Sequence, residues 1–229
     1  MKQLLKNVLL LTGLMLGSLA AAQDYQVLKN PIPQRAGPGQ VVVQQFLWHK
    51  CIHCYRLEAD VQTWLDHDKP EFLVFERVPV AWSDDHLADG AFYTAAVALY
   101  RQGALGQREL ERINDGLFDL HFGKQLPLDP ENALPFFQPH GIQDVEQLLA
   151  LIGSPDARDE RSRAQRLTMG YQIASVPVFV GAGKYLVSLS TLGPDATPEK
   201  LFATINRLAA QERPRPLITP FVIPQRAPL

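Results

Sequence analysis

The sequence predicts an α/β domain that is interrupted by an all-helical insertion. Three segments carry this prediction: a strand–helix–strand pattern at residues 41–80, a helical block at residues 84–170, and two short strands followed by a helix at residues 176–211. Helices that cover a mixed sheet give one of the few stable layered architectures. The 46% hydrophobic and 20% charged content is that of a globular protein, and the net charge of −2 gives no reason to expect a nucleic-acid partner.

The first segment begins with a run of β-branched and aromatic residues at 41–48, as expected of a buried central strand. A helix should follow directly, and Pro70 should end it. Its apolar face is formed by Leu57, Val61, Trp64 and Leu65. Residues 72–80 are a second candidate strand. A pair of cysteines therefore lies where the first strand ends and the helix begins.

The helical block carries three apolar stripes at helical spacing, which we expect to face a core. They are Phe92, Ala95, Ala96 and Leu99; Leu110, Ile113, Leu117 and Leu120; and Val145, Leu148, Leu149 and Ile152. Strand character returns at residues 176–180 and 184–189, which are joined by a glycine-containing turn of hairpin length. A last helix begins at Thr197 or Pro198 and carries Leu201, Ile205 and Leu208.

Both ends of the chain differ in composition from this domain. Residues 1–22 combine two lysines, an apolar run shorter than the ~20 residues that span a bilayer, and three final alanines, so they predict a cleaved signal peptide and export. An uncleaved anchor is the alternative. Residues 212–229 hold five prolines and are expected to be a mobile tail, or one docked through Phe221 and Val222. The intervening divisions are 23–83, 84–170 and 171–211.

The two cysteines of the chain, Cys51 and Cys54, predict a redox-active pair. Unpaired backbone N–H groups at a helix N-terminus favour an anion, which lowers the pKa of the first thiol and makes it the nucleophile. Two intervening residues leave the second thiol close enough to resolve a mixed disulfide. His53 can add a positive or donating group beside Cys51, or it can be an ordinary exposed histidine. A structural disulfide is disfavoured because so short a loop gives little stabilisation.

Other uses of the pair fit the spacing poorly. A c-type haem requires a histidine directly after the second cysteine, where this chain has Tyr55. A structural zinc site requires four ligands, which only His49 and His53 could complete locally. We therefore expect no metal and no cofactor beyond the Cys51–Cys54 disulfide itself.

A second feature stands far along the chain, where Val176 and Pro177 begin a strand run. A trans proline is awkward inside a sheet unless it starts the strand. A cis proline would instead present the Val176 backbone as an edge for an extended peptide. Both forms are compatible with the sequence.

These motifs resemble the DsbA family of bacterial periplasmic disulfide oxidases. The matching segments are residues 46–55, Glu58, residues 170–180 and residues 183–185, with a long helical block between them. The resemblance implies a thioredoxin fold split by the helical insertion, a cis proline at Pro177 and a periplasmic monomer. It also implies that reduced exported proteins are the substrates and that a quinone-linked, DsbB-like membrane protein reoxidises the enzyme.

Two departures from the family bear on the site. Ile52 replaces the usual proline between the cysteines, and Gln45 stands where the fold usually carries a buried acid that assists proton transfer. Glutamine cannot accept the proton that Cys54 must lose, so water or Glu58 would have to carry it. Alternatively, Gln45 only satisfies a buried hydrogen bond.

Two other functions remain open at this stage. One is a periplasmic reductase or isomerase of the same fold, although residues 23–40 leave too little chain for the dimerisation domain of an isomerase. The other is a secreted binding module with a structural disulfide. The favoured hypothesis is an oxidoreductase that donates the Cys51–Cys54 disulfide to exported proteins.

Overall fold

The structure, a computed structural model, describes residues 24–34 and 36–214. The expected signal peptide and residues 215–229 of the proline-rich tail lie outside this part. A mixed sheet with strand order β1-β5-β4-β2-β3 forms its centre. Its strands are β1 (Gln26–Val27), β2 (Val41–Leu47), β3 (Leu73–Pro79), β4 (Val178–Gly181) and β5 (Tyr185–Val187). The described residues include no helix that is long and apolar enough to cross a membrane.

Strand β2 lies inside the sheet and is buried along its whole length. It pairs in parallel with β3 and antiparallel with β4. In this register Gln45 has Arg77 on one side and Phe179 on the other. Because side chains alternate along a strand, Gln44 and Gln45 project to opposite faces of the sheet.

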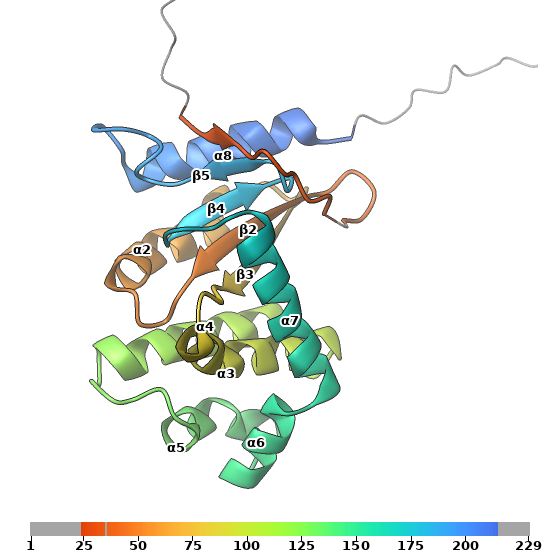
Figure 1. Ribbon diagram of the computed structural model, residues 1–229, viewed down its shortest axis with the longest axis vertical. Coiled ribbons are helices and arrows are strands. Elements are labelled where there is room, and N and C mark those ends of the chain that lie inside the picture. The colour runs from red at the N-terminus through yellow and green to blue at the C-terminus, as the bar shows by residue number, and fades with distance from the viewer. Residues whose placement is uncertain (1–23, 35, 215–229) are drawn as a thin grey trace, which may run out of the picture.

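Helices cover both faces of this sheet. Helix α2 (Ile52–Thr63), the π-helical turn η1 (Trp64–Asp68) and helix α8 (Pro198–Glu212) share one hydrophobic core with β2. Helix α7 (Pro155–Gly170) packs on the other face with Phe46 and Val180. Figure 1 shows the sheet between α8 and the helical part of the molecule.

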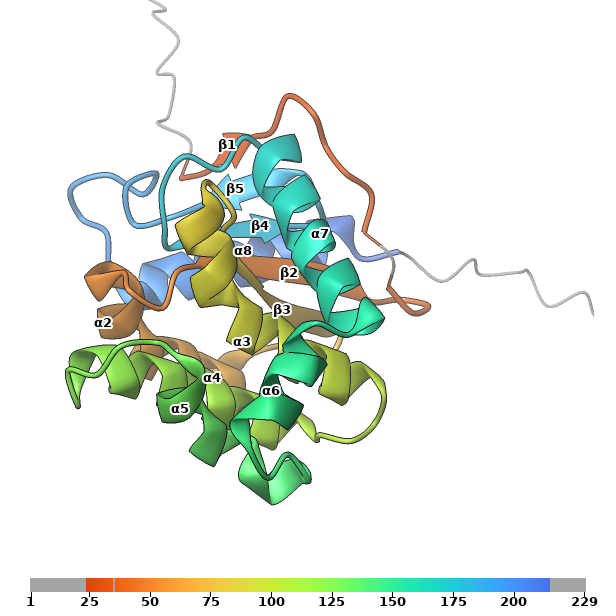
Figure 2. The same cartoon turned by 60° about the horizontal axis from the view of Figure 1, so that its bottom comes forward.

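The helices of the insertion lie together on one side of the sheet (Figure 2) and have a hydrophobic core of their own. The insertion contains α3 (Asp84–Arg101), α4 (Gln107–Phe122), α5 (Pro130–Ala133), the 3₁₀ turns η2 (Leu134–Phe136) and η3 (Gln138–His140), and α6 (Val145–Ile152). Helix α7 joins the two cores, since Ala157 packs in the helical core while Ala164 and Leu167 pack against the sheet. The predicted α/β domain with a helical insertion is thus confirmed.

Four details of the prediction were wrong. Strand β4 begins at Val178 rather than at residue 176, and β5 ends at Val187 rather than at residue 189. The α-helix of α2 ends at Thr63, and the chain reaches Pro70 through the π-helical turn η1. Leu149 is 51% exposed because the two-turn helix α6 buries only Leu148 fully.

Candidate active site

Cys51 occupies the N-cap of α2, four positions after the last residue of the central strand. Its backbone is extended, at φ −92° and ψ 114°, and no side chain caps the helix through a hydrogen bond. The first-turn N–H groups therefore lack a side-chain acceptor other than the Cys51 sulfur. The backbone N–H groups of His53 and Cys54 favour the charged form of that sulfur and so lower its pKa. The N-terminus of α2 is in this way built to hold a thiolate.

The environment of Cys51 favours the charged form. A hydrogen bond from the Cys54 thiol is the largest effect, and it acts with the two backbone N–H groups and with the charge of His53. Together they overcome the opposing effect of burial and lower the pKa of Cys51 from 9 to about 6. At neutral pH the half-buried sulfur is then mostly thiolate, the nucleophilic form.

Cys54 has the opposite environment on the same helix. Its side chain is completely buried against Leu47 and Phe118. Burial raises the pKa of the Cys54 thiol far above its ordinary value, and the hydrogen bond to Cys51 and the Glu58 carboxylate add to this effect. Cys54 therefore remains protonated while Cys51 is ionised. The two sulfurs are free thiols, so the structure represents the reduced state.

The loop before β4 brings Val176 to this sulfur across the fold. The Val176–Pro177 peptide bond is cis, which excludes the trans alternative. The carbonyl oxygen of Val176 lies 3.7 Å from Cys51 Sγ, and the side chains of both residues pack against the cluster around Cys54. Residues 125 positions apart in sequence thus form one site.

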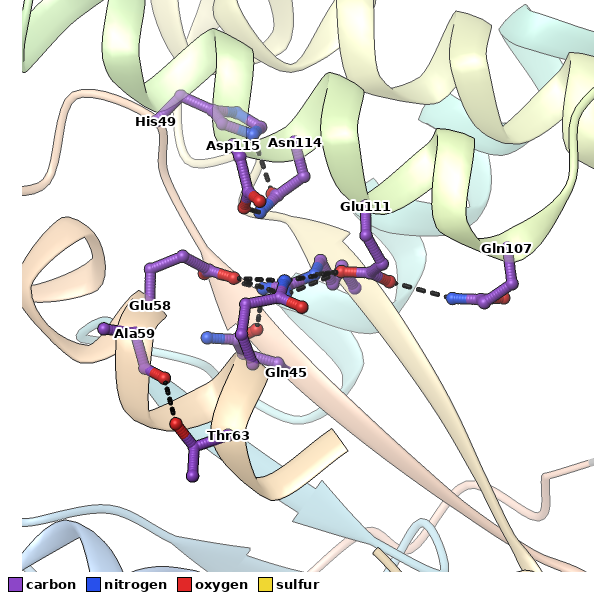
Figure 3. A network of polar contacts seen from close by, with 11 residues as sticks. Gln45, His49, Glu58, Ala59, Thr63, Gln107, Glu111, Asn114 and Asp115 are labelled. Carbon is purple, nitrogen blue, oxygen red and sulfur yellow. Dashed lines mark hydrogen bonds and ion pairs between the residues drawn. The ribbon is translucent and has the colours of Figure 1, made fainter. Parts of the chain in front are cut away.

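A largely buried polar network lies beside the active-site helix (Figure 3). Arg77 of β3 has no exposed side-chain surface and donates to three neighbours. Its Nη1 reaches Gln45 Oε1 at 2.6 Å and Glu58 Oε2 at 2.9 Å, and its Nη2 reaches Glu58 Oε1 at 2.5 Å. From α4 of the helical insertion, Glu111 Oε2 accepts from Arg77 Nε at 2.9 Å and lies 2.8 Å from Nη2. Burial opposes the charge of Arg77, but Glu58 and Glu111 outweigh it and raise its pKa.

Both candidates for proton transfer, Gln45 and Glu58, are hydrogen-bonded to Arg77 in this network. Gln45 is completely buried, and its oxygen accepts from Arg77 while Nε2 has no hydrogen-bond partner among the described residues. Glu58 is also buried, and both of its oxygens accept from Arg77. Gln45 therefore has a structural hydrogen bond, and Glu58 could accept a proton only by weakening an ion pair.

A buried histidine lies on the other side of the cysteines. His49 is 1% exposed, is in contact with the rings of Tyr93 and Phe118, and shares a 3.2 Å hydrogen bond with Asn114 Oδ1. Burial lowers its pKa to about 4, so the imidazole is neutral near pH 7. His53, by contrast, is exposed. Residues 24–34 and 36–214 contain no group of three or more His, Cys, Asp or Glu side chains arranged to hold a metal ion.

Comparison with known proteins places this site in a family. No protein-family model matches the chain. The thiol:disulfide interchange protein DsbA of Burkholderia cepacia is 31% identical over 193 residues, which cover 81% of this chain and 86% of that protein. The chain belongs to the DsbA family. The DsbA of Azotobacter vinelandii is 29% identical and covers 83% of each chain.

Solved structures agree with this assignment. The crystal structure of Pseudomonas aeruginosa DsbA matches with a TM-score of 0.67 and 25% identity, over 83% of this chain and 93% of that one. Reduced DsbA1 from Neisseria meningitidis matches with a TM-score of 0.67 and 26% identity, over 86% and 96% of the two chains. The protein is accordingly a DsbA-like thiol:disulfide oxidoreductase with a thioredoxin fold and a helical insertion.

In this DsbA-family chain the sequence missed two members of the site, Arg77 and Glu111. One signal could have revealed the arginine: a charged residue inside an apolar strand run needs a buried partner. The partner from α4 could not have been found in this way, because only the folding of the insertion onto α2 brings Glu111 near. Ile52, which replaces the family's proline, is 37% exposed beside the cysteines.

Proposed function

We propose that this protein is an exported disulfide donor. Cys51 is the sulfur that exchanges with substrate thiols, and Cys54 is the resolving thiol. The observation that carries this proposal is the opposite ionisation of the two thiols. A group that is most stable as a thiolate is a good leaving group, so a disulfide that includes Cys51 is easily reduced and is a strong oxidant. For this relation DsbA is itself the standard example.

The chemistry proceeds in two exchanges. A substrate thiolate attacks Cys51 Sγ in the oxidised protein, the Cys51–Cys54 bond breaks, and Cys54 leaves and takes up a proton. A second thiolate of the same substrate then attacks the substrate sulfur that is bonded to Cys51, and Cys51 leaves as a thiolate. Two electrons pass to the protein, and the substrate gains one disulfide. A DsbB-like, quinone-linked membrane protein would then accept the two electrons and restore the Cys51–Cys54 disulfide.

The surface around Cys51 supports a reduced, extended exported chain as the substrate. A cavity of about 490 Å³ lies beside the site and is lined by residues including His53, Val176, Pro177 and Leu189. Leu189, which lines this cavity, and Ile52, which follows Cys51 in the chain, each expose more than a third of their surface. An extended peptide could bond to the backbone at Val176 and place apolar side chains on this surface. We place the mature protein in the periplasm, with residues 1–22 as the signal peptide.

Equilibration of the full mature chain with glutathione tests the direction of transfer. The chain has no other cysteines, so alkylation and mass measurement count the reduced fraction directly. We expect half-reduction in a buffer at least tenfold more oxidising than the one that half-reduces an unfolded peptide of the Cys51–Cys54 segment, because the folded protein favours the Cys51 thiolate. Half-reduction in a more reducing buffer than the peptide requires would instead indicate a reductase.

A further inference from the structure

The buried network contains more negative than positive charge. One guanidinium, Arg77, is paired with two carboxylates, Glu58 of α2 and Glu111 of α4. Gln45 contributes a neutral oxygen at 2.6 Å from the guanidinium. The side chains of Glu58 and Glu111 are only 10% and 12% exposed, so water screens this excess charge weakly.

The excess charge lies against the active-site helix. Glu58 is one helical turn after Cys54, and both side chains are buried on the same face of α2. The pair of bonds from Arg77 fixes the Glu58 carboxylate in this place. Glu111 takes up two further N–H groups of the same guanidinium, and Gln62 bridges Glu58 and Glu111 at 2.9 and 3.2 Å.

Of the other ionisable groups around the cluster, Tyr93 and His49 are neutral, whereas Asp115 carries most of a negative charge at neutral pH. On α3, burial keeps the phenol of Tyr93 neutral because its pKa is raised well above 10. In the loop before α2, His49 is neutral, with a pKa of about 4. On α4, burial and then Glu58 raise the pKa of Asp115 to about 6. Asp115 is thus still largely ionised at neutral pH. His53, two residues after Cys51, is exposed to solvent.

We propose that Glu111 is a positioning residue for thiol–disulfide exchange, which holds Arg77 and supplies the extra negative charge that limits the stability of the Cys51 thiolate. With Glu111 neutral, Arg77 and Glu58 would cancel, and the thiolate would have one fewer negative charge nearby. The helical insertion would in this way moderate the oxidising power of a site that lies in the sheet domain. The inference concerns the acidity of the thiols and holds whichever way electrons flow.

Two substitutions separate the charge of Glu111 from its shape. Glu111→Gln keeps the size and an acceptor for Arg77 but removes the charge, whereas Glu111→Asp keeps the charge. We expect Glu111→Gln to raise the thiolate-to-thiol ratio of Cys51 at a given pH by about threefold, the order expected for one charge in partly buried surroundings. Glu111→Asp should match the wild type, as should Glu131→Gln, an exposed glutamate of the same insertion.

The readout is titration of the ultraviolet absorbance of the thiolate in the reduced mature protein, together with the glutathione equilibrium, which should shift toward stronger oxidation by a similar factor. In Gln45→Glu the opposite shift is expected, and the double variant Gln45→Glu/Glu111→Gln should return to the wild-type ratio. An unchanged ratio in Glu111→Gln, or an equal shift in Glu111→Asp, would overturn the proposal. If neither Glu111 variant folds, Gln45→Glu decides, and an unchanged Cys51 ratio in it would overturn the proposal as well.

Discussion

At the scale of single residues, two identical side chains three positions apart have opposite acid–base properties. Cys51 is half-buried, and the Cys54 thiol and nearby backbone N–H groups lower its pKa, whereas Cys54 is buried among apolar side chains and its pKa is raised. The difference does not come from the cysteines themselves. It comes from the start of α2, where Cys51 lies at the N-cap position and Cys54 is buried in the core.

This asymmetry predicts different outcomes for the two serine variants. In Cys54→Ser the Cys51 thiolate can attack a disulfide of a substrate protein, and one substrate sulfur leaves as a thiolate. The mixed disulfide should then accumulate, because no second thiol is present to resolve it. In Cys51→Ser no adduct should form, because the remaining thiol is buried and protonated. Non-reducing gels and mass spectrometry of the trapped species provide the measurement. Comparable adducts in both variants would show that the roles are assigned wrongly.

At the scale of elements, the register between β2 and β3 determines which polar groups meet. Arg77 stands beside Gln45 in the sheet, and α2 and α4 bring one carboxylate each to the same guanidinium. A buried charge is costly unless it is paired and hydrogen-bonded, so these four residues depend on one another. The network therefore links three separate elements to β3.

Removal of Arg77 should accordingly destabilise the fold strongly. Arg77→Leu would leave two buried carboxylates without a counter-charge, and we expect a loss of about 3–5 kcal/mol in the free energy of unfolding. The matched control is Arg163→Leu, which breaks a more exposed ion pair with Glu76, in which each side chain is 27% exposed, and it should cost about 1 kcal/mol. Denaturant melts of both variants test this, and equal losses would contradict the assigned role of the buried network.

At the scale of the whole molecule, the acidity of the thiols couples the redox state to stability. A pKa of Cys51 near 6, below its ordinary value of 9, adds stability to the reduced fold that grows as pH rises from 6 to 9. Cys54 has the opposite sign: its raised pKa gives stability that is present below pH 9 and lost above it, when the unfolded chain ionises. The oxidised protein has neither contribution.

The stability of the reduced form relative to the oxidised form should therefore rise between pH 6 and pH 9 and fall above pH 9. Each pH unit of the rise adds at most about 1.4 kcal/mol, and solvent screening at the half-buried Cys51 reduces this amount. His49 is present in both the reduced and the oxidised protein, so its titration largely cancels in the stability difference between them. Denaturant melts of both redox forms across this range are the measurement, and a difference that stays flat with pH would exclude the low Cys51 pKa.

The sequence alone was sufficient for the local features. The run at 41–48, the Cys51–Cys54 spacing and the stripes of the insertion each depend on a pattern of a few neighbouring residues, and each pattern predicted the right type of element. The Val176–Pro177 pair was recognised as special from the sequence, and the cis bond that the resemblance to the DsbA family implied is the one in the structure.

Contacts between distant segments were decided only by the tertiary structure. Nothing local to Glu111 shows that its carboxylate is bound to Arg77 under the active-site helix, because that contact requires the insertion to fold back onto α2 and β3. The same holds for Gln45 and Glu58, which were recognised as candidates but whose partner was not. Sequence patterns specify which face of an element is buried, whereas the charges that meet in the core depend on how all the elements pack together.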